Sequence, residues 1–246
     1  MTISFNARII LVLALLASAM PVGIARAASP AATAASGQSQ AGSATSSAPP
    51  PGLVVVQEDV LIPLLAQPDA NFKRAKKDFA RGDTKGAAAE VRAGAALLKL
   101  EAGRHHARNK RGLDQAARRL DRLAIQLEAG KVKSPQPLNA DFADADLALA
   151  RHYHDMAEQS LGRKDKRTGD WIEASANSLE DATRWSGRKL ASGAKTSVDG
   201  ARSLASRIAS GADWTVKEAH ANVTALGRQI DSLVAGGSGS KTNSAN

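Results

Sequence analysis

The clearest pattern along the chain is a stripe of apolar residues near its C-terminus. Between residues 192 and 235, apolar side chains recur at steps of three or four residues, as on one face of an α-helix. Polar residues such as Arg202 and Lys217 occupy the opposite face. The pattern predicts one long amphipathic helix over 192–235. Its stripe consists of Val198, Ala201, Ala205, Ile208, Ala212, Val216, Ala219, Val223, Leu226, Ile230 and Leu233.

Residues 53–129 predict a first helical hairpin region. Apolar positions with helical spacing lie on both sides of a Gly-Asp turn, and Asp83 of that turn is a suitable N-cap for the second helix. A further stripe covers 113–127. The intervening stretch 103–112 is polar and bounded by glycines, which disfavour a helix interior. A kink or break is therefore expected there.

A linker at 130–137, rich in glycine, lysine and proline, precedes a second helical hairpin region at 138–191. Within this region Gly169 and Asp170 predict a turn, with Asp170 as the N-cap of the next helix. Trp171 and Trp185 are fourteen residues apart on that helix, nearly four full turns, so both can face the same partner helix. Glycines between 187 and 200 favour a break before the last helix.

The N-terminal 27 residues predict a secretory signal peptide. Arg8 precedes an apolar stretch that ends before a proline, and small residues at Ala25 and Ala27 suit a cleavage site. The stretch is shorter than the roughly 20 apolar residues of a spanning helix, although an uncleaved anchor stays an alternative. The sequence thus predicts an exported protein, in the periplasm or secreted.

Low-complexity segments flank the predicted helical part. Residues 28–52 are rich in Ala, Ser and Pro and predict a disordered linker, and residues 236–246 predict a disordered tail. The β-branched run at 53–65 fits either a short strand or a buried helical turn, and we favour a short helix ending near Ile62.

Composition supports an all-α fold of helical hairpins or a bundle. Aromatic residues make up only 3% of the chain, while the abundant Ala, Leu, Arg and Lys are good helix formers. The chain has no cysteine, which excludes disulfides and thiolate chemistry.

Residues 75–98, with a lysine-rich helix, a short Gly-Asp turn and an alanine-rich helix, resemble the YfdX family of exported helical proteins. The resemblance covers only this stretch. It implies a periplasmic, helical, stress-associated protein and brings no catalytic residues with it.

Basic residues concentrate in the middle of the chain. Residues 99–133 hold ten Lys or Arg and four acidic residues, within a chain of formal net charge +9. Such a segment could bind an anionic polymer or lipid surface, or it could be an ordinary solvated helix face. No aromatic residues suited to stacking on bases lie there, so no specific nucleic-acid recognition is expected. The candidate anion-binding residues are Arg104, Arg108, Lys110, Arg111, Arg118, Arg119 and Arg122.

Catalytic, cofactor and metal sites are not predicted. The best metal candidates are His154 with Glu158 and His152 with Asp155, but each pair lacks a third ligand in the sequence. We therefore expect a non-enzymatic interaction or stress-protective module that binds a protein partner or self-associates. An electrostatic binder of anionic envelope polymers or lipid is the alternative. The candidate helix-interaction face is Trp171, Trp185, Ile208, Val216, Val223, Leu226 and Ile230.

Overall fold

The structure is a computed structural model that describes residues 67–104, 109–163, 167–190 and 192–238. Within these ranges the chain forms seven α-helices, one short 3-10 helix and no strand, so the all-α prediction is confirmed. The elements are α2 (Gln67–Ala80), α3 (Thr84–Ala102), α4 (Lys110–Glu128), α5 (Gln136–Ser160), η2 (Leu161–Arg163), α6 (Arg167–Ser186), α7 (Ser192–Ser210) and α8 (Val216–Ser238).

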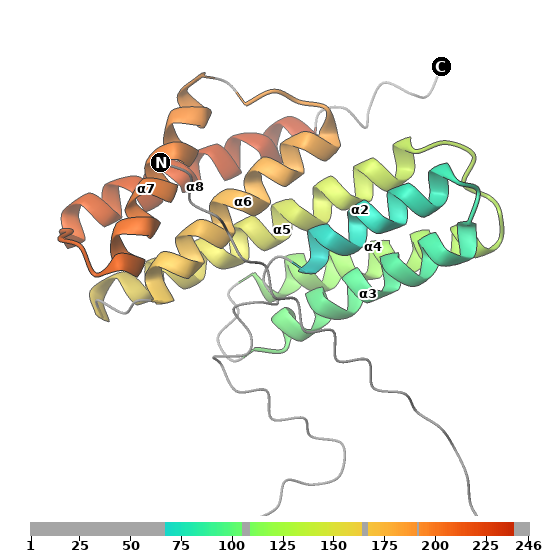
Figure 1. Cartoon of the computed structure of the whole chain (residues 1–246), viewed down its shortest axis with the longest axis horizontal. Coiled ribbons are helices and arrows are strands. Elements are labelled where there is room, and N and C mark those ends of the chain that lie inside the picture. The colour runs from blue at the N-terminus through green and yellow to red at the C-terminus, as the bar shows by residue number, and fades with distance from the viewer. Residues whose placement is uncertain (1–66, 105–108, 164–166, 191, 239–246) are drawn as a thin grey trace, which may run out of the picture. The chain divides into compact units, whose positions relative to one another are not determined.

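Most packing joins helices that are consecutive in the chain, and α5 lies at the centre (Figure 1). α5 contacts α4 and α6, its neighbours in sequence, and also α2 and α8. Its buried face carries Phe142 and Tyr153, which bring aromatic rings into the middle of the core. The Phe142 ring stacks on that of Phe72 from α2, with centroids 4.5 Å apart.

The first hairpin forms as predicted. Gly82 adopts a positive φ of 81° between α2 and α3, and the Asp83 carboxylate accepts a hydrogen bond of 2.8 Å from the Gly86 backbone N–H. The expected break is also present, because α3 ends with a C-cap at Gly103 and α4 begins at Lys110.

Two predicted boundaries are wrong by a few residues. α5 begins at Gln136, inside the predicted linker, with Pro135 at its N-cap and Pro137 in its first turn. The first turn of a helix has no intrahelical partners for its N–H groups, so proline is tolerated there. α6 begins at Arg167, which places Gly169 and Asp170 inside its first turn and not in a turn before it.

The single long helix predicted over 192–235 is wrong: the segment is a hairpin of α7 and α8. Gly211 ends α7 with a φ of 73°, and the next N–H, from Ala212, donates to the Arg207 carbonyl oxygen at 2.9 Å. This is the hydrogen-bond pattern of a Schellman motif. The Thr215 hydroxyl then accepts a hydrogen bond from the Glu218 N–H and caps α8.

The break expected between 187 and 200 is confirmed at Gly187. This residue has a φ of 67°, and the following N–H, from Arg188, donates to the Thr183 carbonyl oxygen at 3.1 Å. Gly193 and Gly200 lie within α7. Residues 168–235 therefore contain three helices.

Several predictions concern residues outside the described ranges. These are the signal peptide at 1–27, the linker at 28–52, the short helix within 53–65, and Arg108. The tail predicted at 236–246 is wrong for residues 236–238, which continue α8, and its remaining residues, 239–246, lie outside the described ranges. None of the described helices is both long enough and apolar enough to cross a bilayer.

Candidate functional site

The two tryptophans of α6 both face α5, as their spacing predicts. Trp171 stacks on Tyr153 with ring centroids 5.9 Å apart, and Trp185 meets Phe142 edge to face at 5.3 Å. Both indoles are buried. These side chains therefore hold α6 against α5 within the chain.

The apolar stripe of α7 and α8 is also used within the chain. Ile208 of α7 is buried, as are three predicted interaction residues of α8: Val223, Leu226 and Ile230. The stripe packs α7 against α6 and α8, and α8 against α5. Among the predicted interaction residues of α7 and α8, Val216, 41% exposed at the start of α8, is the exception. Self-association through this stripe is therefore no longer needed to explain its apolar character.

The structure divides the predicted basic residues into two groups. Arg104 turns inward and pairs with Glu101, and Arg119 pairs with Asp144 of α5. The others that the structure describes are exposed, and none of them pairs with a carboxylate in the described part of the chain. These exposed residues are Lys110, Arg111, Arg118 and Arg122.

Three of the exposed residues, Arg111, Arg118 and Arg122, form what we call the arginine ridge. They follow one another along α4 at steps of seven and four residues, so they share one face of the helix. Eleven residues of α-helix span about 16 Å. Ile125, 59% exposed, follows Arg122 by three residues and continues the same face. The ridge thus combines unpaired positive charge with one exposed apolar side chain.

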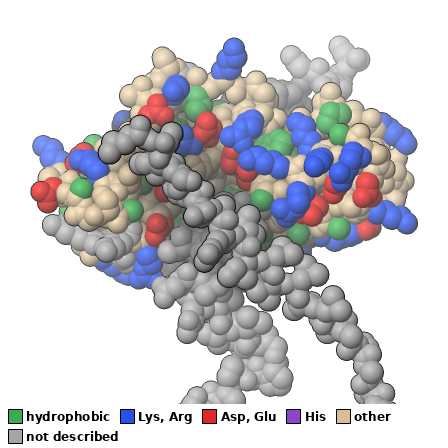
Figure 2. Space-filling model, in the orientation of Figure 1, with side chains coloured by type: hydrophobic (Ala, Val, Ile, Leu, Met, Phe, Trp, Pro, Cys, Tyr) green, Lys and Arg blue, Asp and Glu red, His purple; other side chains and the backbone are tan. Residues whose placement is uncertain are grey.

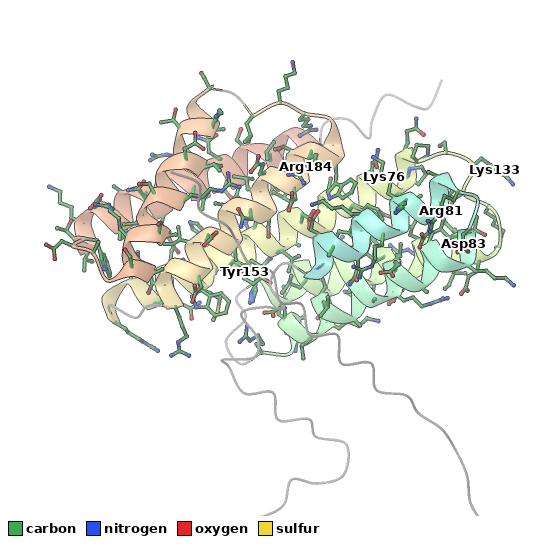
Figure 3. The ribbon with its side chains drawn as sticks, in the orientation of Figure 1. Lys76, Arg81, Asp83, Lys133, Tyr153 and Arg184 are labelled. Atoms are coloured by element: carbon green, nitrogen blue, oxygen red, sulfur yellow. The ribbon has the colours of Figure 1, made fainter. Side chains whose placement is uncertain are left out.

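The basic residues over α2 and α3 are arranged differently. Figure 2 shows Lys and Arg side chains interspersed with Asp and Glu over these helices. Arg74 pairs with Glu90 at 2.9 Å, and Arg81 pairs with Asp78 at 2.5 Å. Arg81 and Asp83 are labelled in Figure 3 at the turn that joins the two helices. These two arginines are compensated by carboxylates, whereas Lys77 and Lys85 on the same two helices are exposed without a salt-bridge partner in the described part of the chain.

A buried ionic cluster that the sequence did not predict joins α3 to α5. The Glu101 carboxylate lies 3.2 Å from His152 Nε2 and 3.2 Å from Arg104 Nη1, and Glu101 and His152 are both buried. The Arg104 guanidinium also lies over the Trp171 ring, 5.3 Å from its centroid. Burial raises the pKa of Glu101, but the hydrogen bond with His152 and the charge of Arg104 outweigh it and hold the pKa below its usual value.

His154, Asp155 and Glu158 could hold a metal ion together, since their ligand atoms all lie within 4.8 Å of one another. The His152–Asp155 pair suggested by the sequence does not form, because His152 points to Glu101. His154 Nε2 lies 3.0 Å from the Val223 carbonyl oxygen, which orients the ring. Burial lowers the pKa of His154, but the Asp155 and Glu158 carboxylates raise it more, so the net shift is upward.

In a second buried carboxylate, Asp146 of α5, no hydrogen bond or positive charge outweighs the effect of burial on the pKa. Its side chain is 2% exposed, and its Oδ2 atom has no hydrogen-bond partner in the described structure. Burial raises the pKa of Asp146 well above its ordinary value, and the nearby carboxylates of Asp181 and Asp69 raise it further. The Trp185 indole and the Arg184 guanidinium oppose the shift without cancelling it. The pKa of Asp146 is therefore higher in the folded protein than that of an ordinary aspartate.

We expect Asp146→Asn to raise the thermal midpoint at pH 7.5. An acid whose folded pKa is raised contributes stability that is present below its unfolded pKa, about 3.9, and is lost as the pH rises through the folded pKa. Asparagine has the shape of the protonated acid and does not titrate, so the gain should vanish near pH 3. Melting followed by circular dichroism at both pH values checks this. A gain of equal size at both would contradict a titrating Asp146.

No family model matches the chain, and neither a curated protein nor a solved structure matches it either, so the resemblance of residues 75–98 to the YfdX family stays a hypothesis.

Proposed function

We propose that the protein is an exported, non-enzymatic helical module that binds an anionic lipid surface through the arginine ridge of α4. The observation that carries the proposal is the placement of Arg111, Arg118 and Arg122, which are exposed on one helix face with no carboxylate partner in the described part of the chain. Export rests on the N-terminal pattern of a charged residue, an apolar stretch and a small-residue cleavage site.

The position of Ile125 favours a lipid surface over a soluble polymer. Lipid headgroups offer phosphates to the arginines, and the acyl boundary behind them accepts apolar side chains. Ile125 continues the ridge toward the C-terminal end of α4 and is mostly exposed. A soluble polyanion would use the three arginines in the same way but would gain little from the isoleucine.

The test is binding to vesicles of phosphatidylglycerol and phosphatidylcholine in 50 mM NaCl. Each basic residue near such a surface contributes about 1 kcal/mol. Reversing all three ridge charges to glutamate should therefore weaken binding by roughly a hundredfold or more. The matched control reverses Lys189, Lys217 and Arg228, three exposed residues outside α4 that change the net charge equally. Their reversal should weaken binding much less, because they lie on other segments.

Two further experiments distinguish a lipid surface from a soluble polyanion and test whether binding is electrostatic. Ile125→Ser should weaken vesicle binding but leave binding to inorganic polyphosphate unchanged, because only the bilayer offers an apolar layer. Raising the salt to 300 mM should weaken both, since exposed charges are screened. Equal losses from the ridge and the control variants, or binding that is insensitive to salt, would contradict the proposal.

A further inference from the structure

A cavity of about 440 Å³ opens between α2, α5 and α6, with Arg202 of α7 at its edge. It lies apart from the arginine ridge, none of whose residues lines it. Arg184, labelled in Figure 3 on α6, is one of its lining residues. The apolar part of the wall comes from Pro68, Leu149 and Ala174.

The cavity is acidic although the chain as a whole is basic. Its lining contains two arginines, Arg184 and Arg202, and six carboxylates. The carboxylates come from three helices, so the fold and not one local sequence brings them together. They are Asp69, Asp146, Asp170, Glu173, Glu180 and Asp181.

Bases already pair with several of these carboxylates. Lys73 bonds Asp69 Oδ2 at 2.5 Å, and the two arginines of the cavity wall pair with Asp181 and Glu180. None of these bases bonds Asp146. Asp170 also has an interaction partner within the chain. The lining nevertheless contains six carboxylates against two arginines, so it is acidic on balance.

Two carboxylate oxygens in this wall have no hydrogen-bond partner in the described structure. One is Oδ2 of Asp146, whose side chain is almost completely buried, and the other is the buried Oδ1 of Asp69. Buried acceptors without donors are costly and uncommon in folded proteins. A ligand that brings hydrogen-bond donors and positive charge would satisfy both.

The geometry favours an organic cation over a metal ion. In the described part of the chain, the grouping with ligand atoms close enough for one ion is that of His154, Asp155 and Glu158, not the carboxylates of this cavity. A bare ion would also leave most of the 440 Å³ unfilled. An alkylammonium group offers three N–H donors, and a methylene chain can lie against Leu149 and Ala174.

We propose that this cavity binds an aliphatic di- or polyamine, with one ammonium group on Asp146 and Asp69 and the methylene chain along the apolar wall. A second ammonium group reaches the carboxylates toward Glu173 and Glu180. Because two lining arginines stay paired, the ligand replaces no existing ion pair.

Binding is coupled to loss of a proton from Asp146. Without ligand, burial and the carboxylates of Asp181 and Asp69 raise the pKa of this side chain and so favour its protonated form, against the opposing effects of the Trp185 indole and Arg184. An ammonium group that arrives as a cation favours the ionised form. The Asp146 proton then passes to the buffer, and the amine stays protonated in the cavity.

The experiment is calorimetric titration of the purified protein with spermidine at pH 7, in two buffers of different ionisation enthalpy. The wild type should bind one spermidine and release a fraction of a proton. Asp146→Asn should lower the affinity tenfold or more, because hydrogen bonds to charged groups contribute about 1.5–3 kcal/mol, and should abolish proton release. Asp213→Asn, which removes an exposed carboxylate outside the cavity, is the matched control and should leave both quantities unchanged.

Three results would overturn the proposal. The first is no heat of binding with wild-type protein, and the second is equal spermidine affinity for the wild type and Asp146→Asn. The third is displacement of spermidine by an equimolar amount of Mg²⁺, which would assign the cavity to a metal ion. The asparagine variant mimics the protonated acid, so its fold, checked by circular dichroism, should be intact.

Discussion

Replacing Phe142 with alanine is expected to lower the free energy of unfolding by about 3–5 kcal/mol. The Phe142 ring is fully buried and touches two other helices, stacking on Phe72 of α2 and meeting Trp185 of α6 edge to face. Alanine would remove the apolar area and leave a cavity where three helices meet, which the packed helices can close only in part by moving toward one another. Urea unfolding followed by circular dichroism measures the loss.

The control for this variant is Ile125→Ala. Ile125 also sits on a helix, but most of its side chain is exposed, so its truncation should change the free energy of unfolding by less than about 0.5 kcal/mol. A loss below about 1 kcal/mol for Phe142→Ala would mean that these rings do not form the centre of the core.

Glu101→Gln is expected to cost about 3 kcal/mol. The substitution keeps the shape of the side chain but removes the charge that His152 and Arg104 share. Removing one charge of a buried ion pair leaves the opposite charge buried without a partner. The free-energy cost of such a change is therefore larger than the net contribution of the pair to stability. The matched control is Glu90→Gln, since Glu90 pairs with Arg74 at the surface and should contribute about 1 kcal/mol or less.

The pH dependence gives a second check on Glu101. Its pKa is lowered in the folded protein, so its contribution to stability is present above the unfolded pKa of about 4.3 and is lost as the pH falls through the folded pKa. The difference between wild type and Glu101→Gln should therefore be largest near pH 7 and shrink below pH 4. A difference that stays constant down to pH 3 would show that the cost is steric and not electrostatic.

The helical fold could be predicted because most of its signals are local. The three-to-four-residue spacing of apolar side chains, the Gly82 turn with its Asp83 cap, and the glycines near 103 and 187 each act within one or two turns of helix. Trp171 and Trp185 also share a partner helix simply because fourteen residues make nearly four turns.

The break at Gly211 could not be found from the apolar spacing alone. The stripe keeps steps of three or four residues through the loop at 211–215, because Ala212 and Val216 happen to continue it although both are exposed. The correct signals were different ones: a glycine able to adopt positive φ at 211 and a threonine suited to an N-cap at 215. The turn chemistry of Gly211 and Thr215, and not the apolar periodicity, therefore marks this break.

The site residues were harder to predict because their chemistry depends on partners distant in sequence. Glu101 and His152 are fifty-one residues apart, and each looks like an ordinary helix-surface residue until α3 and α5 pack together. Glu101 follows the buried Leu98 by three residues, so its position on the apolar face was the available signal. For the basic segment, only the fold shows that Arg104 and Arg119 are paired while the arginine ridge is not.

The succession of neighbouring helix pairs has a consequence for how the chain acquires its structure. Most contacts join consecutive helices, and the return of α8 onto α5 is the main exception. Chains with such low contact order fold quickly, since little loop-closure entropy must be lost before burial begins. If the polypeptide emerges N-terminus first, each new helix meets the preceding helix, one of its packing partners, already in place. The apolar face of each helix is then exposed to solvent only briefly, which limits aggregation during folding. The core is complete when α8 packs onto α5.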